Sequence, residues 1–64
     1  MLRKTNHKEY ELITNKYDFY INQIDNQWVI DVFDHNIEDN QNAYLYSFNT
    51  SSFSEAKEEI KNYV

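Results

Sequence analysis

Four acidic residues and a histidine lie close together in the middle of the chain and are the first candidates for chemistry. They are Asp31, Asp34, His35, Glu38 and Asp39. A calcium-binding loop starting at Asp34 would have Asp39 at its sixth position, which requires glycine, and Leu45 at its twelfth, which requires a bidentate glutamate. A transition-metal site requires more imidazole or thiolate than His7 and His35 supply in a chain without cysteine. We therefore expect no metal site and no cofactor.

Catalysis would have to use the pair Asp31 and His35, or the pair Ser47 and His35. No phosphate-binding loop or nucleophile motif surrounds these residues, and the chain contains no glycine. A chain of 64 residues also leaves little room for a pocket of about 300 Å³. We expect that the protein is not an enzyme.

Residues 17–34 predict a β-hairpin around which the rest of the chain is arranged. Residues 17–24 and 27–34 each alternate apolar with polar side chains, as half-buried strands do. Asp25 and Asn26 separate the two runs, and both residue types tolerate the positive φ of a tight hairpin turn. A two-residue turn pairs Ile24 with Gln27 and Tyr17 with Asp34.

This register sorts the hairpin into two faces, because side chains on opposite positions of paired strands point the same way. The first face contains the larger apolar set: Tyr17, Phe19, Ile21, Trp28, Ile30 and Val32. The second face mixes charged, polar and apolar side chains: Asp18, Tyr20, Asn22, Ile24, Gln27, Val29, Asp31 and Phe33. We expect the first face to be the core.

The C-terminal stretch 53–64 predicts a helix that covers this core. Ser52 and Glu55 have the spacing of a capping box, and Phe53, Ala56 and Ile60 recur at helical spacing with Val64 or Tyr63. The helix is too short to be stable alone, so it must pack on the sheet.

Three other segments are less clearly patterned. Residues 1–9 are polar and basic and read as a flexible lead. Residues 10–14 fit either an edge strand or a helical turn, because five residues show no clear period. Residues 43–49 read as a strand that places Tyr44, Tyr46 and Phe48 on one side, with the buried side left open. The prediction is a single α+β domain over 1–64, with a three- or four-stranded antiparallel sheet and a C-terminal helix (βββα or ββββα), or else αβββα.

Charge is distributed unevenly along the chain, whose formal net charge is −5. Between Lys16 and Lys57 there is no Lys or Arg but there are seven acidic residues. Such a surface repels nucleic acid and anionic lipid and attracts basic protein surfaces. A non-enzymatic protein-binding module with an acidic, aromatic face is therefore expected. The partner-binding residues are predicted to be Asp18, Tyr20, Asp31, Phe33, Glu38 and Asp39.

A narrower hypothesis is a nucleic-acid mimic from a phage or mobile element that inhibits a host nucleic-acid-handling protein. The many Asn, Ile, Lys, Tyr and Phe residues have AT-rich codons, which indicates a low-GC bacterium or its phage. One alternative is a small homodimeric cytoplasmic protein without an active surface, in which a second copy covers the second face; residues 1–14 of the same chain could also cover that face. Another alternative is a weak nucleic-acid binder. The latter would use the basic lead residues Arg3, Lys4 and Lys8. No apolar run or export signal is evident, so a cytoplasmic location without membrane contact is expected.

Overall fold

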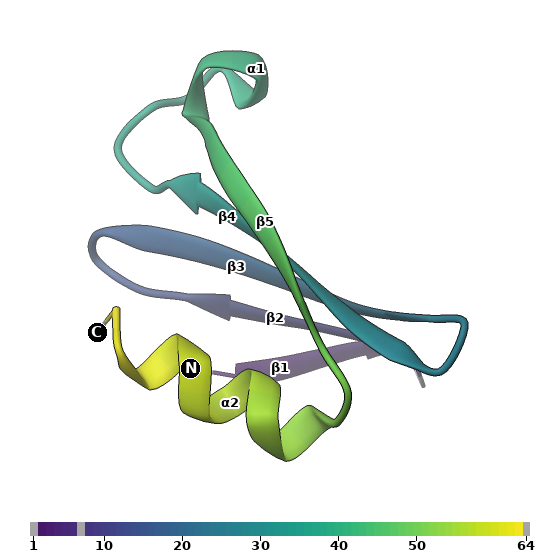
Figure 1. Cartoon of the computed structure of the whole chain (residues 1–64). Helices are drawn as coiled ribbons and strands as arrows, with labels where there is room; N and C mark the ends of the chain where they lie inside the picture. Colours follow the sequence, from purple (N-terminus) through teal and green to yellow (C-terminus); the bar gives the residue numbers. More distant parts are fainter. Residues whose placement is uncertain (1, 7, 64) are drawn as a thin grey trace.

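The computed structural model describes residues 2–6 and 8–63, which form a five-stranded antiparallel sheet with a helix against one face (Figure 1). Each strand pairs with the next one in the chain, in the order β1-β2-β3-β4-β5. The α+β class, the antiparallel sheet and the C-terminal helix are therefore confirmed. The elements are β1 (Leu2–Asn6), β2 (Glu9–Ile13), β3 (Tyr17–Ile24), β4 (Gln27–Asp34), α1 (Asn40–Ala43), β5 (Tyr44–Thr50) and α2 (Phe53–Lys61).

The expected count of three or four strands is wrong because both N-terminal segments join the sheet. Residues 2–6, expected to form a lead, form the edge strand β1, in which Leu2 pairs with Leu12 and Arg3 with Glu11. Every side chain of β1 is exposed, so the strand carries no burial pattern that periodicity could reveal. Residues Glu9–Ile13 form β2 beside β3, which excludes the αβββα alternative. The N-terminal segments thus widen the sheet sideways and do not cover its second face.

The central hairpin has the predicted turn and register. Asp25 has φ 49° and Asn26 has φ 66°, the pair of positive values that a type I′ turn requires. Tyr17 lies opposite Asp34, and Ile24 lies opposite Gln27, with unbroken pairing between them. The two predicted faces of the hairpin are therefore present.

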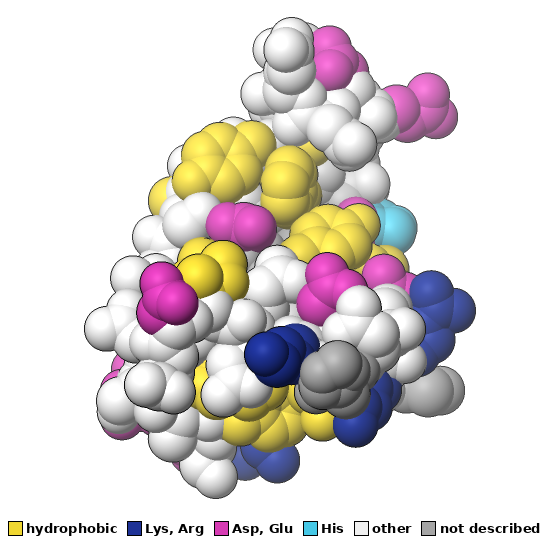
Figure 2. Space-filling model, turned by 90° about the vertical axis from the view of Figure 1, so that its right-hand side faces the viewer, with side chains coloured by type: hydrophobic (Ala, Val, Ile, Leu, Met, Phe, Trp, Pro, Cys, Tyr) yellow, Lys and Arg dark blue, Asp and Glu magenta, His cyan; other side chains and the backbone are white. Residues whose placement is uncertain are grey.

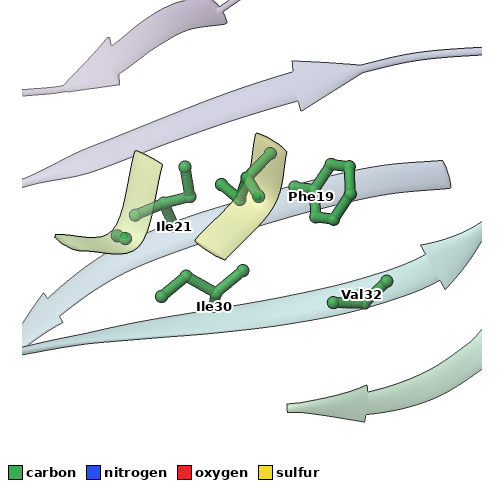
Figure 3. Packing of buried hydrophobic residues seen from close by; sticks show 6 residues of the cluster. Phe19, Ile21, Ile30 and Val32 are labelled. Atoms are coloured by element: carbon green, nitrogen blue, oxygen red, sulfur yellow. The ribbon is translucent and has the colours of Figure 1, made fainter. Parts of the chain in front are cut away.

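The core lies between the first hairpin face and α2 (Figure 3). Four side chains from β3 and β4 are fully buried there: Phe19, Ile21, Ile30 and Val32. Ala56 and Ile60 of α2 pack against them, together with half-buried aromatic residues such as Trp28 and Tyr63. Val64, the other predicted member of the helix stripe, lies outside the described residues, as does His7.

Helix α2 begins at the predicted cap. Ser52 Oγ accepts a hydrogen bond from the Glu55 amide (3.1 Å), the first half of the capping box. The Glu55 carboxylate accepts from the Ser51 hydroxyl (3.3 Å) rather than from the Ser52 amide. The helix ends at Lys61, where the Asn62 amide donates to the Glu59 carbonyl (3.1 Å), three residues back, and tightens the last turn.

Strand β5 contains an irregularity that divides its side chains between the two sheet faces. Tyr46 lies opposite Val32 and Phe48 opposite Ile30, on the core side, but the register shifts at the next position and Tyr44 lies opposite Phe33. An extra residue in one strand reverses the alternation of the side chains beyond it. The expectation that Tyr44 shares a face with Tyr46 and Phe48 is therefore wrong.

Candidate protein-binding face

The sheet face opposite α2 carries the second set of hairpin side chains, and we call it the open face. The pairing of β3 with β4 places Asp18 opposite Phe33 and Tyr20 opposite Asp31. Four of the six predicted partner-binding residues are thus adjacent on two neighbouring strands. The open face also includes neighbours from the flanking strands by register: Glu9 and Glu11 of β2, and Tyr44, Ser47 and Asn49 of β5.

A row of three aromatic rings crosses the open face diagonally from β3 to β5. The Tyr20 and Phe33 ring centroids are 5.4 Å apart with an interplanar angle of 83°. The Phe33 and Tyr44 rings are 5.5 Å apart at 66°. Both contacts have the edge-to-face geometry that aromatic pairs favour. The rings therefore support one another as a continuous apolar ridge, with Phe33 half-buried between two exposed tyrosines.

Carboxylates lie on both sides of this aromatic row. Asp31 accepts a hydrogen bond from Ser47 Oγ (2.5 Å), and the Tyr44 hydroxyl contacts the same Ser47 Oγ (2.7 Å). Asp18 lies 2.7 Å from His35 Nδ1. These contacts orient both carboxylates while leaving them partly accessible to solvent. Figure 2 shows the resulting surface, on which acidic and hydrophobic side chains alternate and Lys and Arg gather toward the lower edge.

The electrostatics of Tyr20 reflect this acidic setting. Partial burial raises its pKa, and the negative charges of Asp18 and Glu11 raise it further. The phenol therefore remains protonated at any physiological pH. It presents a hydroxyl that donates and accepts hydrogen bonds beside the carboxylates.

Two cationic groups reduce the negative charge at the edges of the face. Arg3 of β1 forms an ion pair with Glu11, and its own side chain is largely exposed. His35 adds positive charge beside Asp18 only when it is protonated. Exposed pairs of this kind contribute little to stability. On β5, the residues paired with Asp31 and Val29 are the neutral Ser47 and Asn49. Among the described residues, no cation is therefore paired with Asp31, whose negative charge lies in the middle of the face.

The remaining two predicted residues, Glu38 and Asp39, lie outside these strands. Both are exposed in the connection between β4 and β5, which projects beyond one end of the sheet (Figure 1). The Asp39 carboxylate accepts hydrogen bonds from the Gln41 amide (3.1 Å) and from Asn42 Nδ2 (3.0 Å), and so caps α1. Asp39 therefore has a local structural role, and these two residues do not belong to the aromatic row.

None of the open-face residues from β2 and β5 is among the predicted partner-binding residues, and three of them show why. Glu11 could have been assigned by alternation once residues 10–14 were taken as a strand. Tyr44 could not, because the irregularity in β5 moves it to the open face. Ser47 reaches Asp31 only through the pairing of β4 with β5, which the sequence alone does not give.

Within residues 2–6 and 8–63, no group of three or more His, Cys, Asp or Glu side chains is arranged to hold a metal ion. Neither helix in that part of the chain has the length and hydropathy that a membrane span requires. Comparisons with protein-family models, curated proteins and solved structures give no match. The geometry and charge of the open face are therefore the features that bear on function.

Proposed function

We propose that this protein is a non-enzymatic binding module that docks its open face on a basic surface of another protein. The observation that carries the proposal is the aromatic row of Tyr20, Phe33 and Tyr44 between the carboxylates Asp18 and Asp31. Aromatic side chains surrounded by polar groups are typical of the energetic centres of protein interfaces.

The position of the row on the sheet supports this proposal. It lies on paired strands and not on a loop, so little conformational entropy would be lost on binding. Tyr20 and Tyr44 are 38% and 47% exposed, although each packs against Phe33. Joined through Phe33, the two rings form a contiguous apolar patch, and such patches often mark interaction sites.

Charge supports a basic partner over nucleic acid or a lipid surface. Asp18 and Asp31 on the open face would attract Lys and Arg side chains and repel phosphates. Asp31 accepts one hydrogen bond from Ser47, so its remaining lone pairs are available to a guanidinium or ammonium group. A cation placed over Tyr20 or Tyr44 would also interact with the ring face.

A narrower form of the proposal is an inhibitor from a phage or mobile element that occupies the phosphate-binding site of a host nucleic-acid-handling protein. The acidic open face and the AT-rich codon preference of the composition support it. In this form the partner is cytoplasmic, and nucleic acid competes for the same surface.

The test is affinity capture from a lysate of a low-GC bacterium, followed by direct binding of the recovered protein. Wild type is compared with Asp18→Lys/Asp31→Lys on the open face. The matched control is Glu58→Lys/Glu59→Lys, which makes the same change in charge on exposed positions of α2. Circular dichroism establishes that all three proteins are folded.

The proposal predicts a basic partner that binds wild type and the α2 control but does not bind the open-face variant. Its affinity for wild type should fall as the salt concentration is raised. Displacement by duplex DNA would support the inhibitor form, and failure of DNA to compete would leave only the broader module. A partner that binds all three proteins alike, or no partner, would contradict docking through the open face.

A further inference from the structure

The two edge strands of the sheet differ in how they are protected from pairing with another strand. β1 carries Arg3 and Lys4, and charged side chains are a common defence of exposed edges. β5 reads YLYSFNT and contains no charged residue and no proline. Its Tyr44, Leu45 and Tyr46 are 47%, 43% and 37% exposed. Its register is irregular between Tyr44 and Tyr46 but regular from Tyr46 to Thr50. This regular part of β5 therefore leaves its free edge open to a further strand.

We propose that β5 pairs antiparallel with β5 of a second copy of this chain, which joins the two sheets into one of ten strands. A two-fold arrangement requires a surface that is complementary to itself. The neutral β5 meets this condition, whereas a β1 pair would bring cationic side chains of the two copies together. This inference concerns the sheet edge and does not rest on the function proposed for the open face.

A register centred on Ser47, the middle residue of β5, gives favourable side-chain neighbours. It places Tyr46 of each copy opposite Phe48 of the other, on the side covered by α2. Within one chain these rings already lie 6.4 Å apart, and Tyr46 also packs on Tyr63 at 5.8 Å. The dimer would extend this cluster across the two-fold axis, where aromatic cross-strand pairs stabilise sheets. The exposed ring of Tyr46 would become buried.

Repulsion between the acidic copies does not oppose this pairing strongly. The nearest open-face carboxylate by register is Asp31, one strand inward from β5 and opposite Ser47. Across the dimer the two Asp31 residues would be three strand spacings apart, about 14 Å. The Debye length at physiological ionic strength is about 8 Å, so this repulsion is largely screened. Added salt should therefore strengthen the dimer, the opposite of its effect on a basic partner.

The test is sedimentation of the purified protein from about 10 µM to about 1 mM, a range that spans weak dimers. Wild type is compared with Ser47→Lys, which places two lysines against each other at the two-fold axis. The matched control is Thr5→Lys, which adds the same charge to the exposed strand β1. Amide hydrogen exchange of wild type at the two ends of this range identifies the strand that pairs, without any substitution.

The proposal predicts a mass rising from 7.8 kDa toward twice that value for wild type and Thr5→Lys, with Ser47→Lys remaining monomeric. Exchange should slow with concentration at alternate amides of β5 and remain unchanged in β1. A constant wild-type mass would overturn the proposal, and so would equal dimerisation of Ser47→Lys in a folded state. Protection appearing in β1 in place of β5 would also overturn it.

Discussion

Tyr20 and Phe33 meet edge to face across β3 and β4, with ring centroids 5.4 Å apart and an interplanar angle of 83°. The two residues are diagonal neighbours, because Tyr20 is paired with Asp31 and Phe33 with Asp18. The contact therefore joins two cross-strand pairs that each contain an aspartate, Asp18 with Phe33 and Tyr20 with Asp31. Phe33 also contacts Tyr44, which continues the row.

A double-mutant cycle should detect this ring contact. Tyr20→Ala and Phe33→Ala should each destabilise the fold, and the two effects should be coupled by about 0.5–1.5 kcal/mol. Urea unfolding of the two single variants and the double variant provides the measurement. Strictly additive effects would show that the rings do not support one another.

The core should be far less tolerant than the open face. Phe19 is fully buried, so Phe19→Ala should cost about 3–5 kcal/mol, comparable with the whole stability of a small domain. Ile24→Ala, at a side chain that is 52% exposed, should cost less than about 1 kcal/mol. Thermal unfolding followed by circular dichroism compares the two variants. A cooperative transition near the wild-type temperature for Phe19→Ala would contradict the assigned core.

The hairpin turn should respond to the residue type at position 26. Asn26 has φ 66°, a value that β-branched residues adopt only at a cost of about 1–2 kcal/mol. Asn26→Val should therefore destabilise by about that amount, and Asn26→Gly should be neutral or stabilising by roughly 0.5 kcal/mol. The denaturant midpoint of Asn26→Val should lie below the wild-type value, and that of Asn26→Gly should equal or exceed it. The reverse order would exclude the type I′ turn.

The N-terminal cap of α2 should make a measurable contribution. Ser52→Ala removes the acceptor for the Glu55 amide and should cost about 1 kcal/mol. The neighbouring Ser51→Ala removes only an exposed contact to the Glu55 side chain and serves as the control, with an effect below about 0.5 kcal/mol. Equal losses for the two variants would indicate that Ser52 is not the cap.

Alkaline pH should destabilise the fold through Tyr46. Partial burial, followed by the hydrogen bond with Tyr63, raises the pKa of Tyr46 from 10.0 to about 12. Because the unfolded chain releases this proton first, the contribution of Tyr46 is fully present below pH 10 and is lost as pH rises toward 12. Urea unfolding at pH 9 to 12 should show a decline that is shallower in Tyr46→Phe. Identical pH profiles for the two proteins would contradict the raised pKa.

The sequence predicted the hairpin well because several local signals agree. Alternation fixes which side chains of β3 and β4 share a face, and Asp25 and Asn26 fit the turn that sets the register. The consequence is that Asp18, Tyr20, Asp31 and Phe33 lie together on the open face, as expected. The start of α2 could be predicted equally well from the sequence, because the Ser52 cap is a local motif.

The sheet edges were not predictable in the same way. β1 is held to β2 by backbone pairing, and its exposed side chains show no hydrophobic period. The irregularity in β5 changes the face of Tyr44 without any glycine or proline to mark it. Glu38 and Asp39 were assigned because they belong to the acidic run between Lys16 and Lys57, but the connection after β4 carries them away from the strands (Figure 1). These features depend on tertiary pairing, which a pattern along one strand does not contain.

The central claim is that the open face is the binding surface, and NMR shift mapping tests it most directly. The ¹⁵N-labelled protein would be titrated with the basic partner recovered by capture, at low salt. We predict that the amides with the largest shifts will be those of Tyr20, Asp31, Phe33 and Tyr44, with those of α2 nearly unchanged. Shifts concentrated in α2 or β1, with the open face unperturbed, would contradict the claim.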